Sequence, residues 1–175
     1  MKILITGIGG SGKTTVVDTL AERGEVGVDL DRTGLCFWEN KETGEREAYV
    51  AGAGKEWIEK HGWRCDIFAL QKYLVEFPQE KDVYIGGKIA SSQFAEVAPL
   101  FDKIFLLRPS DEVLSHRQET RTNKTNNFAK SPEEREHLRT ARVKFEKVCA
   151  DNGAVIIDAD KSIDEIVGEI KSLSE

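Results

Sequence analysis

The sequence predicts an α/β fold of three layers, αβα, with a five-stranded parallel sheet in the middle. Three observations predict it: short apolar runs with strand character, helical patterns between them, and a glycine-rich turn directly after the first run. Near-continuous apolar strands that alternate with helices are typical of a parallel sheet covered on both faces. The expected strands are Lys2–Thr6, Val26–Leu30, Val83–Gly86, Ile104–Leu107 and Ala154–Asp158.

The length of 175 residues is enough for one domain with a core and too short for two ordinary domains. We expect the core to comprise residues 1–33, 80–116 and 131–175, with a substrate-binding insertion at 34–79 and a lid at 117–130. No window approaches the ~18 apolar residues that a membrane helix requires. Because the chain also begins in a strand-like run without a signal-peptide pattern, we expect a cytoplasmic protein with no membrane partner.

Charge and cysteine content exclude other kinds of partner. The net charge is −6, although residues 103–147 hold eleven Lys and Arg against seven Asp and Glu. An acidic chain with one basic segment is not expected to bind nucleic acid, but it could hold a small polyanion. The three cysteines lack CxxC spacing and have no histidine near them, which predicts reduced, partly buried thiols instead of a disulfide or a zinc site.

The turn after the first strand, GIGGSGKTT, matches the P-loop motif G-x-x-x-x-G-K-[ST] between a strand and a helix. Its backbone amides can surround phosphate oxygens, and the N-terminus of the following helix adds the positive end of its dipole. We expect Lys13 to reach the β- and γ-phosphates and the Thr14 hydroxyl to ligate Mg²⁺. The predicted nucleotide-binding residues here are Gly7, Gly9, Gly10, Ser11, Gly12, Lys13, Thr14 and Thr15.

The second strand runs into two acids, Asp29 and Asp31, in the sequence VDLDRTG. Two residues apart on an extended strand, both side chains would point the same way at the carboxyl edge of the sheet, where ligands bind in open α/β folds. Phosphoryl transfer to an alcohol needs two roles that carboxylates can fill: one carboxylate lies near Mg²⁺, and the other accepts the hydroxyl proton. The alternative is a solvated acidic turn.

The expected insertion, residues 34–79, contains all three tryptophans. Within it, FWENKETGEREAY predicts two short strands around a turn at Glu42–Gly44, and a helical pattern over Ile67–Phe77 ends before Pro78.

After the third strand, IGGKIASSQ supplies a second glycine-rich turn, whose Gly86, Gly87 and Lys88 could approach the substrate closely. The glycines could instead serve only to let helix and sheet pack. This strand also lacks the acid that many P-loop ATPases place at its end to organise Mg²⁺.

The basic segment follows the fourth strand. Ser110 is expected to cap a helix that carries Arg117 and Arg121 on one face, from which they could grip a nucleotide at its base and its phosphate. The polar stretch 120–130 is a candidate mobile loop. Ser131, Pro132 and Glu134 then restart a helix with an arginine stripe, Arg135, Arg139 and Arg142, beside its apolar face. In the last helix, Ser162 and Glu165 fit a capping box.

These motifs resemble the small-molecule branch of the P-loop kinases. The two acids are similar to those of shikimate and gluconate kinases, which implies metal support by Asp29 and acceptor contact by Asp31; the IGGK turn resembles that of shikimate kinase, which has one more glycine. Adenylate-kinase-like enzymes have a similar lid edge, which implies Arg117 over adenine and Arg121 on the phosphates. The resemblance further implies strand order 2-3-1-4-5 and a loop with Asp160 beside adenine. It also implies that an arginine of the helix after the lid binds the substrate. We expect this to be Arg142 before Arg139, and we expect Arg135 to be solvated.

Several segments, among them DLDRTGLCFW, IGGKIASSQF and RTNKTN, also resemble proteins described as adenylate-kinase-like or AAA-family ATPases, over nearly the whole chain. The chain has no room for the helical lid domain of an AAA unfoldase after its core.

The resulting hypothesis is an Mg²⁺-dependent kinase that transfers the ATP γ-phosphate to a small-molecule hydroxyl or phosphate. The expected catalytic residues are Lys13, Asp31, Arg121 and Arg142, and the expected substrate-binding residues are Asp31, Gly86, Gly87, Lys88, Arg139 and Arg142. One alternative is a nucleoside monophosphate kinase, for which the insertion offers few arginines, Arg46 and Arg64. Another is a P-loop ATPase or nucleotide switch that binds a partner in place of a small acceptor. Both ATP and GTP remain possible donors.

Overall fold

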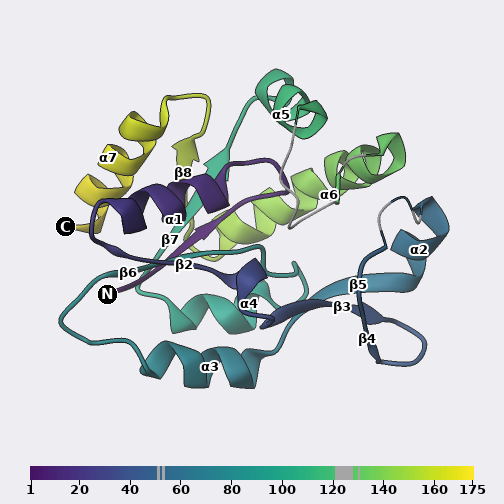
Figure 1. The fold of residues 1–175 in the computed structure, drawn as a ribbon, viewed down its shortest axis with the longest axis horizontal. Coiled ribbons are helices and arrows are strands. Elements are labelled where there is room, and N and C mark those ends of the chain that lie inside the picture. Colours follow the sequence, from purple (N-terminus) through teal and green to yellow (C-terminus); the bar gives the residue numbers. More distant parts are fainter. Residues whose placement is uncertain (51, 53, 121–127, 130) are drawn as a thin grey trace.

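The computed structural model describes residues 1–50, 52, 54–120, 128–129 and 131–175. A five-stranded sheet runs through its centre in the order β2-β6-β1-β7-β8, and every neighbouring pair is parallel (Figure 1). Counted along the chain, these strands have the order 2-3-1-4-5, so the predicted sheet is confirmed. The strands are β1 (Lys2–Thr6), β2 (Val26–Asp29), β6 (Val83–Gly86), β7 (Lys103–Arg108) and β8 (Val155–Asp158).

One face of the sheet is covered by α1 (Lys13–Glu22) and α7 (Ile163–Ser174). The strands turn alternate residues toward these helices, so that Ile3 and Ile5 of β1 lie in this core while Leu4 lies in the opposite one. Val17 and Leu20 of α1, with Val167 and Ile170 of α7, complete the packing. Since β1 is buried on both faces, its apolar run is continuous.

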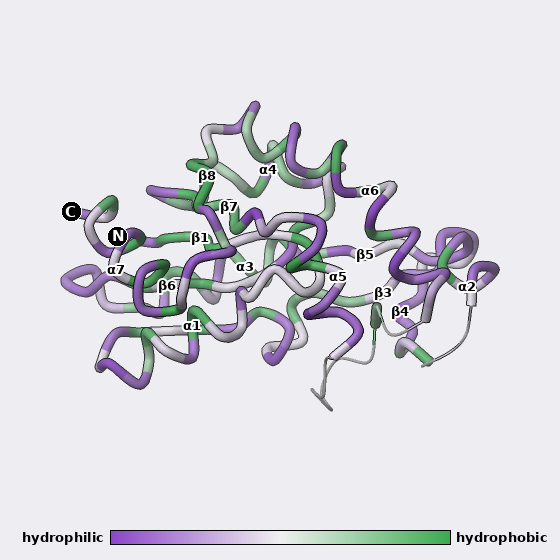
Figure 2. The backbone as a smooth tube through the Cα atoms, turned by 90° about the horizontal axis from the view of Figure 1, so that it is seen from above, coloured by the Kyte–Doolittle hydropathy of each residue, from purple (hydrophilic) through white to green (hydrophobic). Residues whose placement is uncertain are grey.

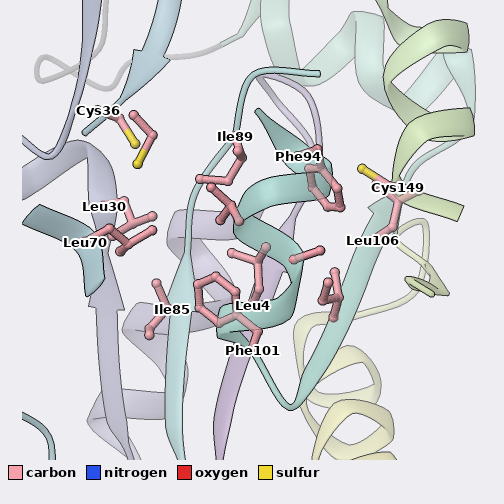
Figure 3. Packing of buried hydrophobic residues seen from close by; sticks show 14 of the residues in the cluster. Leu4, Leu30, Cys36, Leu70, Ile85, Ile89, Phe94, Phe101, Leu106 and Cys149 are labelled. Atoms are coloured by element: carbon pink, nitrogen blue, oxygen red, sulfur yellow. The ribbon is translucent and has the colours of Figure 1, made fainter. Parts of the chain in front are cut away.

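The other face is covered by α3 (Ile67–Val75), α4 (Phe94–Val97) and α6 (Pro132–Asp151). Leu4, Ile85 and Leu106 from the strands meet Leu70 of α3 and Phe94 of α4 in this second core (Figure 3). Helix α5 (Asp111–Glu119) adds Leu114 to it, and a 3₁₀ turn over Ala98–Leu100 leads from α4 into β7. Together the two faces give the three layers that the sequence predicts.

The segment between β2 and α3 contains a second, smaller sheet. A 3₁₀ turn over Leu30–Arg32 leads from β2 to the antiparallel strands β3 (Cys36–Asn40), β4 (Arg46–Glu47) and β5 (His61–Cys65), in the order β4-β3-β5. The predicted hairpin is therefore present, but β5 and the helix α2 (Gly54–Lys60) before it were not predicted. Helix α3 packs against the main sheet. The part that includes β3, β4, α2 and β5 projects from the core (Figure 1). We call this part, residues 36–50, 52 and 54–65, the projecting sheet.

Local sequence signals define most helix ends. Ser110, Ser131 and Ser162 cap α5, α6 and α7, and the boxes formed by Ser131 with Glu134 and by Ser162 with Glu165 are both complete. Gly24 follows the end of α1 with a φ of 88°, as expected for a glycine after a helix. Among the described residues, no helix combines the length and apolar character needed to cross a membrane.

Candidate active site

The turn between β1 and α1 has a backbone that only glycine adopts easily. Gly10 and Gly12 have φ values of 95° and 101°, and a Cβ on Gly10 would lie 3.0 Å from Cγ of Gln118. The Lys13 side chain folds back over this turn, where its ammonium donates to the carbonyl oxygens of Gly7 and Ile8 at 2.9 and 3.0 Å. The cation therefore lies beside the backbone that would surround a phosphate.

Helix α1 begins without the features that start α5, α6 and α7. Gly12 at its N-cap offers no side-chain acceptor and its first turn holds no acid, whereas α5, α6 and α7 each have a serine cap and two acids. The first amides of α1 and the positive end of its dipole are thus left for an external anion. This contrast supports a phosphate site at the N-terminus of α1.

Thr14 and Asp29 meet beside this turn. The Thr14 hydroxyl donates to Oδ2 of Asp29 at 2.7 Å, joining the start of α1 to the end of β2. Asp29 is 8% exposed, and its other carboxylate oxygen accepts the Asp31 amide at 2.9 Å. The two expected metal ligands thus lie together and offer the hard oxygen donors that Mg²⁺ prefers.

Asp29 and Asp31 do not lie on one extended strand, as the sequence analysis assumed. Strand β2 ends at Asp29, which caps the 3₁₀ turn that contains Asp31. The backbone turns here because the Asp31 amide donates a hydrogen bond to the Asp29 carboxylate. A carboxylate that accepts from the backbone amide two residues later favours a turn over a strand. Asp31 nevertheless reaches the same cavity as the P-loop.

A cavity of about 500 Å³ extends along the carboxyl edge of the sheet. Its lining includes the P-loop residues from Gly9 to Thr15. Toward α7, its lining includes Lys161, Ile163 and Ile166, and toward the projecting sheet it includes Trp38 and Trp63. Figures 1 and 2 show α7 and the projecting sheet at opposite ends of the molecule, so the cavity connects two regions far apart in the fold.

Aromatic rings define the cavity end beside the projecting sheet. Trp38 packs edge-on against Trp63, with ring centres 5.3 Å apart at 70°, and lies 5.2 Å from the tilted ring of Phe128. The Trp63 indole donates to the carbonyl oxygen of Lys88 at 2.8 Å, which fixes that ring to the turn after β6. Trp57 packs behind Trp38 at 5.2 Å and does not line the cavity.

Lys88 brings a cation into the same space. Its side chain is partly buried, lines the cavity and holds its ammonium 5.7 Å from the centre of the Phe145 ring. Burial lowers the pKa of this lysine, while the nearby Asp31 carboxylate acts in the opposite direction. Within the described ranges Lys88 has no ion-pair partner and its ammonium makes no hydrogen bond, so an anionic ligand would compensate its burial.

Helix α5 holds the P-loop through two adjacent side chains. Arg117, expected at the nucleotide, lines the cavity and donates to the carbonyl oxygens of Ala159 at 2.9 Å and Ser11 at 3.5 Å. Gln118 is buried and donates to the carbonyl of Gly9 at 2.8 Å. Gln118 is not predictable from the sequence, because a glutamine inside a charged helix carries no signal of its own.

Gly86 and Gly87 have packing reasons to be glycine. A Cβ on Gly86 would lie 3.0 Å from Val17, and one on Gly87 would lie 2.7 Å from Cδ1 of Leu30. Both residues are buried and neither lines the cavity. The structure therefore favours the packing explanation that the sequence left open.

The arginines expected after the lid lie outside the cavity. Arg142 is bound by Glu146 at 2.6 Å and Asp111 at 2.7 Å, with its side chain 12% exposed. Arg139 is 67% exposed and pairs with Glu136. Leu138 of the same helix lines the cavity, whereas Arg142 lies one turn later, beside the start of α5. Neither arginine lines the cavity.

Two further residues, Asp160 and Arg121, are expected from the sequence to bind the nucleotide. Asp160 is exposed and does not line the cavity; the Ser110 amide donates to it at 2.8 Å and holds the pKa of its carboxyl below the usual range. Its neighbour Lys161 lines the cavity instead. Arg121 lies outside the described residues, as does most of the expected lid.

A P-loop between β1 and α1 in a parallel sheet of order 2-3-1-4-5 gives the chain the fold of the P-loop kinases. Solved structures agree. The chain is similar to deoxyadenosine kinase from M. mycoides with bound dATP (TM-score 0.59, 16% identity, 100% of both chains covered). It is also similar to shikimate kinase from Acinetobacter baumannii in complex with shikimate (0.61, 18%, 99% of this chain and 92% of that one). A third is an unliganded sugar kinase from Janibacter sp. HTCC2649 (0.56, 14%, 98% and 92%). No protein-family model and no curated protein matches the sequence.

Proposed function

We propose that the protein is a kinase that transfers the γ-phosphoryl group of ATP, with Mg²⁺, to a hydroxyl group of a small molecule. The observation that carries this proposal is the lining of the cavity, which includes Asp31, Lys88 and the aromatic end as well as the P-loop. A nucleotide site that shares its cavity with these groups has room for an acceptor beside the γ-phosphate. An ATPase needs only the nucleotide site.

The donor would occupy the P-loop and the cavity end beside α7. The amides of the loop and of α1 would bind the phosphates, and Lys13 would neutralise their charge from its position over the turn. Arg117 and Lys161 would flank the base. Thr14 and Asp29 would hold Mg²⁺, which when bound would reduce the negative charge of the phosphates.

Asp31 and Lys88 would act between the P-loop and the aromatic end of the cavity. During transfer, a bond forms from the acceptor oxygen to the γ-phosphorus, the bond from that phosphorus to the β,γ-bridging oxygen breaks, and ADP leaves. The hydroxyl proton would pass to the Asp31 carboxylate, which lines the cavity. Lys88 would offset the charge on the transferring group, a task that the sequence analysis gave to arginines.

Solved structures of similar fold support a kinase without deciding the acceptor. The deoxyadenosine kinase structure holds dATP and the shikimate kinase structure holds shikimate, so one fold binds ligands of different chemistry. A nucleoside monophosphate kinase is less well supported here. The two arginines of the insertion are paired elsewhere, Arg46 with Asp66 and Arg64 with Glu39, and neither lines the cavity.

The test is a turnover assay with purified protein, ATP and Mg²⁺, in the presence and absence of a mixed pool of hydroxyl-bearing metabolites and nucleosides. A kinase forms ADP faster with the pool, and mass spectrometry finds one member heavier by one phosphate. Equal ADP formation in both cases, with no phosphorylated product, would support a P-loop ATPase or nucleotide switch instead.

The variant Asp31→Asn tests the proton acceptor. It should lower the transfer rate about 10²- to 10⁴-fold, the usual contribution of general-base catalysis, and leave the affinity for ATP nearly unchanged. Asp18→Asn is the matched control, because Asp18 pairs with Arg32 on the surface and does not line the cavity. Wild-type transfer by Asp31→Asn would remove Asp31 from the mechanism.

A further inference from the structure

We infer that the acceptor carries a flat aromatic ring system without a phosphate of its own, as a nucleoside does, and that Trp38 and Trp63 bind this ring. This inference rests on the proposed kinase function and names the class of its acceptor. It follows from the rings, the polar groups and the charges at the cavity end beside the projecting sheet.

The geometry of the rings fits a planar group. Trp38 and Trp63 meet at 70°, so they form a corner in which a ring lying flat on one indole turns its edge toward the other. Both arrangements are favourable between aromatic groups. The hydrogen bond from Trp63 to the Lys88 carbonyl, and the contacts of Trp38 with Trp57 and Phe128, hold this corner in place before any ligand arrives.

Among the residues that the structure describes, few polar groups line this end. Besides Trp38 and Trp63, the lining residues there include Phe128 and Leu138, with Asp31 and Lys88 toward the P-loop. A sugar or a hydroxylated ring acid would bury several hydroxyl groups against apolar side chains without hydrogen-bond partners, which is costly. A nucleoside presents its base to the apolar corner and keeps its hydroxyl groups at one end.

The charges favour a hydroxyl over a phosphate as the attacking group. An acceptor phosphate would bring its negative charge beside the Asp31 carboxylate, with Lys88 as the single lysine or arginine lining that end within the described part of the chain. A neutral hydroxyl avoids this repulsion and can give its proton to Asp31.

The experiment compares three sets of acceptors in the transfer assay: nucleosides, the matching nucleoside monophosphates, and polyols without an aromatic ring. Nucleosides should be phosphorylated at a kcat/KM at least about tenfold above the other sets. They should also quench the tryptophan fluorescence of the protein saturated with a non-hydrolysable ATP analogue. Preferential transfer to a polyol or a monophosphate would overturn the inference about the acceptor but not the proposed kinase function. If no compound is phosphorylated and ATP hydrolysis does not depend on an acceptor, both proposals are overturned.

Variants assign the effect to the corner. Trp38→Ala should raise KM for the nucleoside about 10- to 100-fold, as loss of stacking on a base does, with KM for ATP unchanged. Trp38→Phe, which keeps a ring, should recover most of the loss and guards against misfolding of the alanine variant. Trp57→Ala is the matched control, since Trp57 belongs to the same cluster but does not line the cavity. Equal effects of Trp38→Ala and Trp57→Ala on KM would show that the rings only support the fold and overturn the assignment.

Discussion

The surroundings of Lys88 differ from those of an ordinary surface lysine. It lines the cavity, its ammonium lies over the Phe145 ring, and burial lowers its pKa. Water and carboxylates normally stabilise such a charge, and here a bound phosphoryl group would do so in their place. The sequence alone pointed to Lys88 only through its position after two glycines, because burial is a property of the folded chain.

The pH dependence of transfer should report this lysine. A lowered pKa means that the ammonium loses its proton at a lower pH than an ordinary lysine, so the charge is present below that pKa and disappears as pH rises through it. In wild-type protein, kcat/KM should therefore fall on the alkaline side before the ordinary lysine range. Lys88→Met should lose about 10²- to 10³-fold in kcat and also lose this alkaline decline.

The control for Lys88 is Lys147→Met, because Lys147 is 73% exposed and pairs with Asp151 away from the cavity. Its pH profile should match that of the wild type. An unchanged alkaline decline in Lys88→Met would assign the titration to another group and remove Lys88 from the transfer step.

At the scale of elements, side chains from one segment shape the backbone of another. The P-loop is held from α5 by Gln118, and the turn after β6 is held by Trp63 of β5. Such contacts between distant segments depend on tertiary packing, which explains why sequence periodicity found most helices and the main strands but missed Gln118, α2 and β5. In β5, the sequence HGWRC carries no alternation of apolar and polar residues, and its antiparallel partner β3 lies far earlier in the chain, with Cys36 opposite Cys65 and Asn40 opposite His61.

The junction of β6 with the 3₁₀ turn at Leu30 yields a test of packing. Gly87→Ala should destabilise the protein by about 1–3 kcal/mol, since its Cβ would lie 2.7 Å from Cδ1 of Leu30. For a chain of this length the melting temperature should fall by roughly 2–4 °C per kcal/mol. Kinetic constants measured well below the melting temperature should stay close to wild type, because Gly87 does not line the cavity.

Gly168→Ala is the matched control for this substitution. An added Cβ at Gly168 meets nothing within 4 Å, and its position inside α7 means that alanine should stabilise the helix by about 0.5–1 kcal/mol. Thermal unfolding and turnover of both variants are measured together. If Gly87→Ala keeps the wild-type melting temperature but loses turnover, the glycine serves the substrate as first expected.

Across the whole molecule, the candidate site is assembled from residues that are distant in the chain. The P-loop, the turn after β2, the turn after β6 and the end of α5 meet at the carboxyl edge of the sheet. The sequence could predict this meeting for the P-loop and the two acids, because parallel strands end at one edge. It could not orient Arg139 and Arg142, because a helical stripe beside an apolar face can turn toward the cavity or toward neighbouring carboxylates, and the carboxylates of Glu146 and Asp111 hold Arg142.

A ligand that binds across these elements should stabilise the folded chain as a unit. Binding to the native state alone at a hundred times the dissociation constant adds about 2.7 kcal/mol, which corresponds to roughly 5–10 °C in melting temperature at this length. We expect a shift of this size with ATP and Mg²⁺ together, measured by differential scanning fluorimetry, and a clearly smaller one when EDTA removes the metal. The reason is that Thr14 and Asp29 offer their oxygens to the cation at the phosphates.

The part of this shift that depends on Mg²⁺ should disappear in Asp29→Asn, which removes the charge facing Thr14. The melting temperature of the variant without ligand serves as its own baseline, because Asp29 also caps the following turn. Asp82→Asn is the control, since Asp82 binds the N-terminal ammonium and does not line the cavity. A shift of the same size with EDTA, or an undiminished Mg²⁺-dependent shift in Asp29→Asn, would contradict the metal site and leave Lys13 and the loop amides as the groups that neutralise the phosphates.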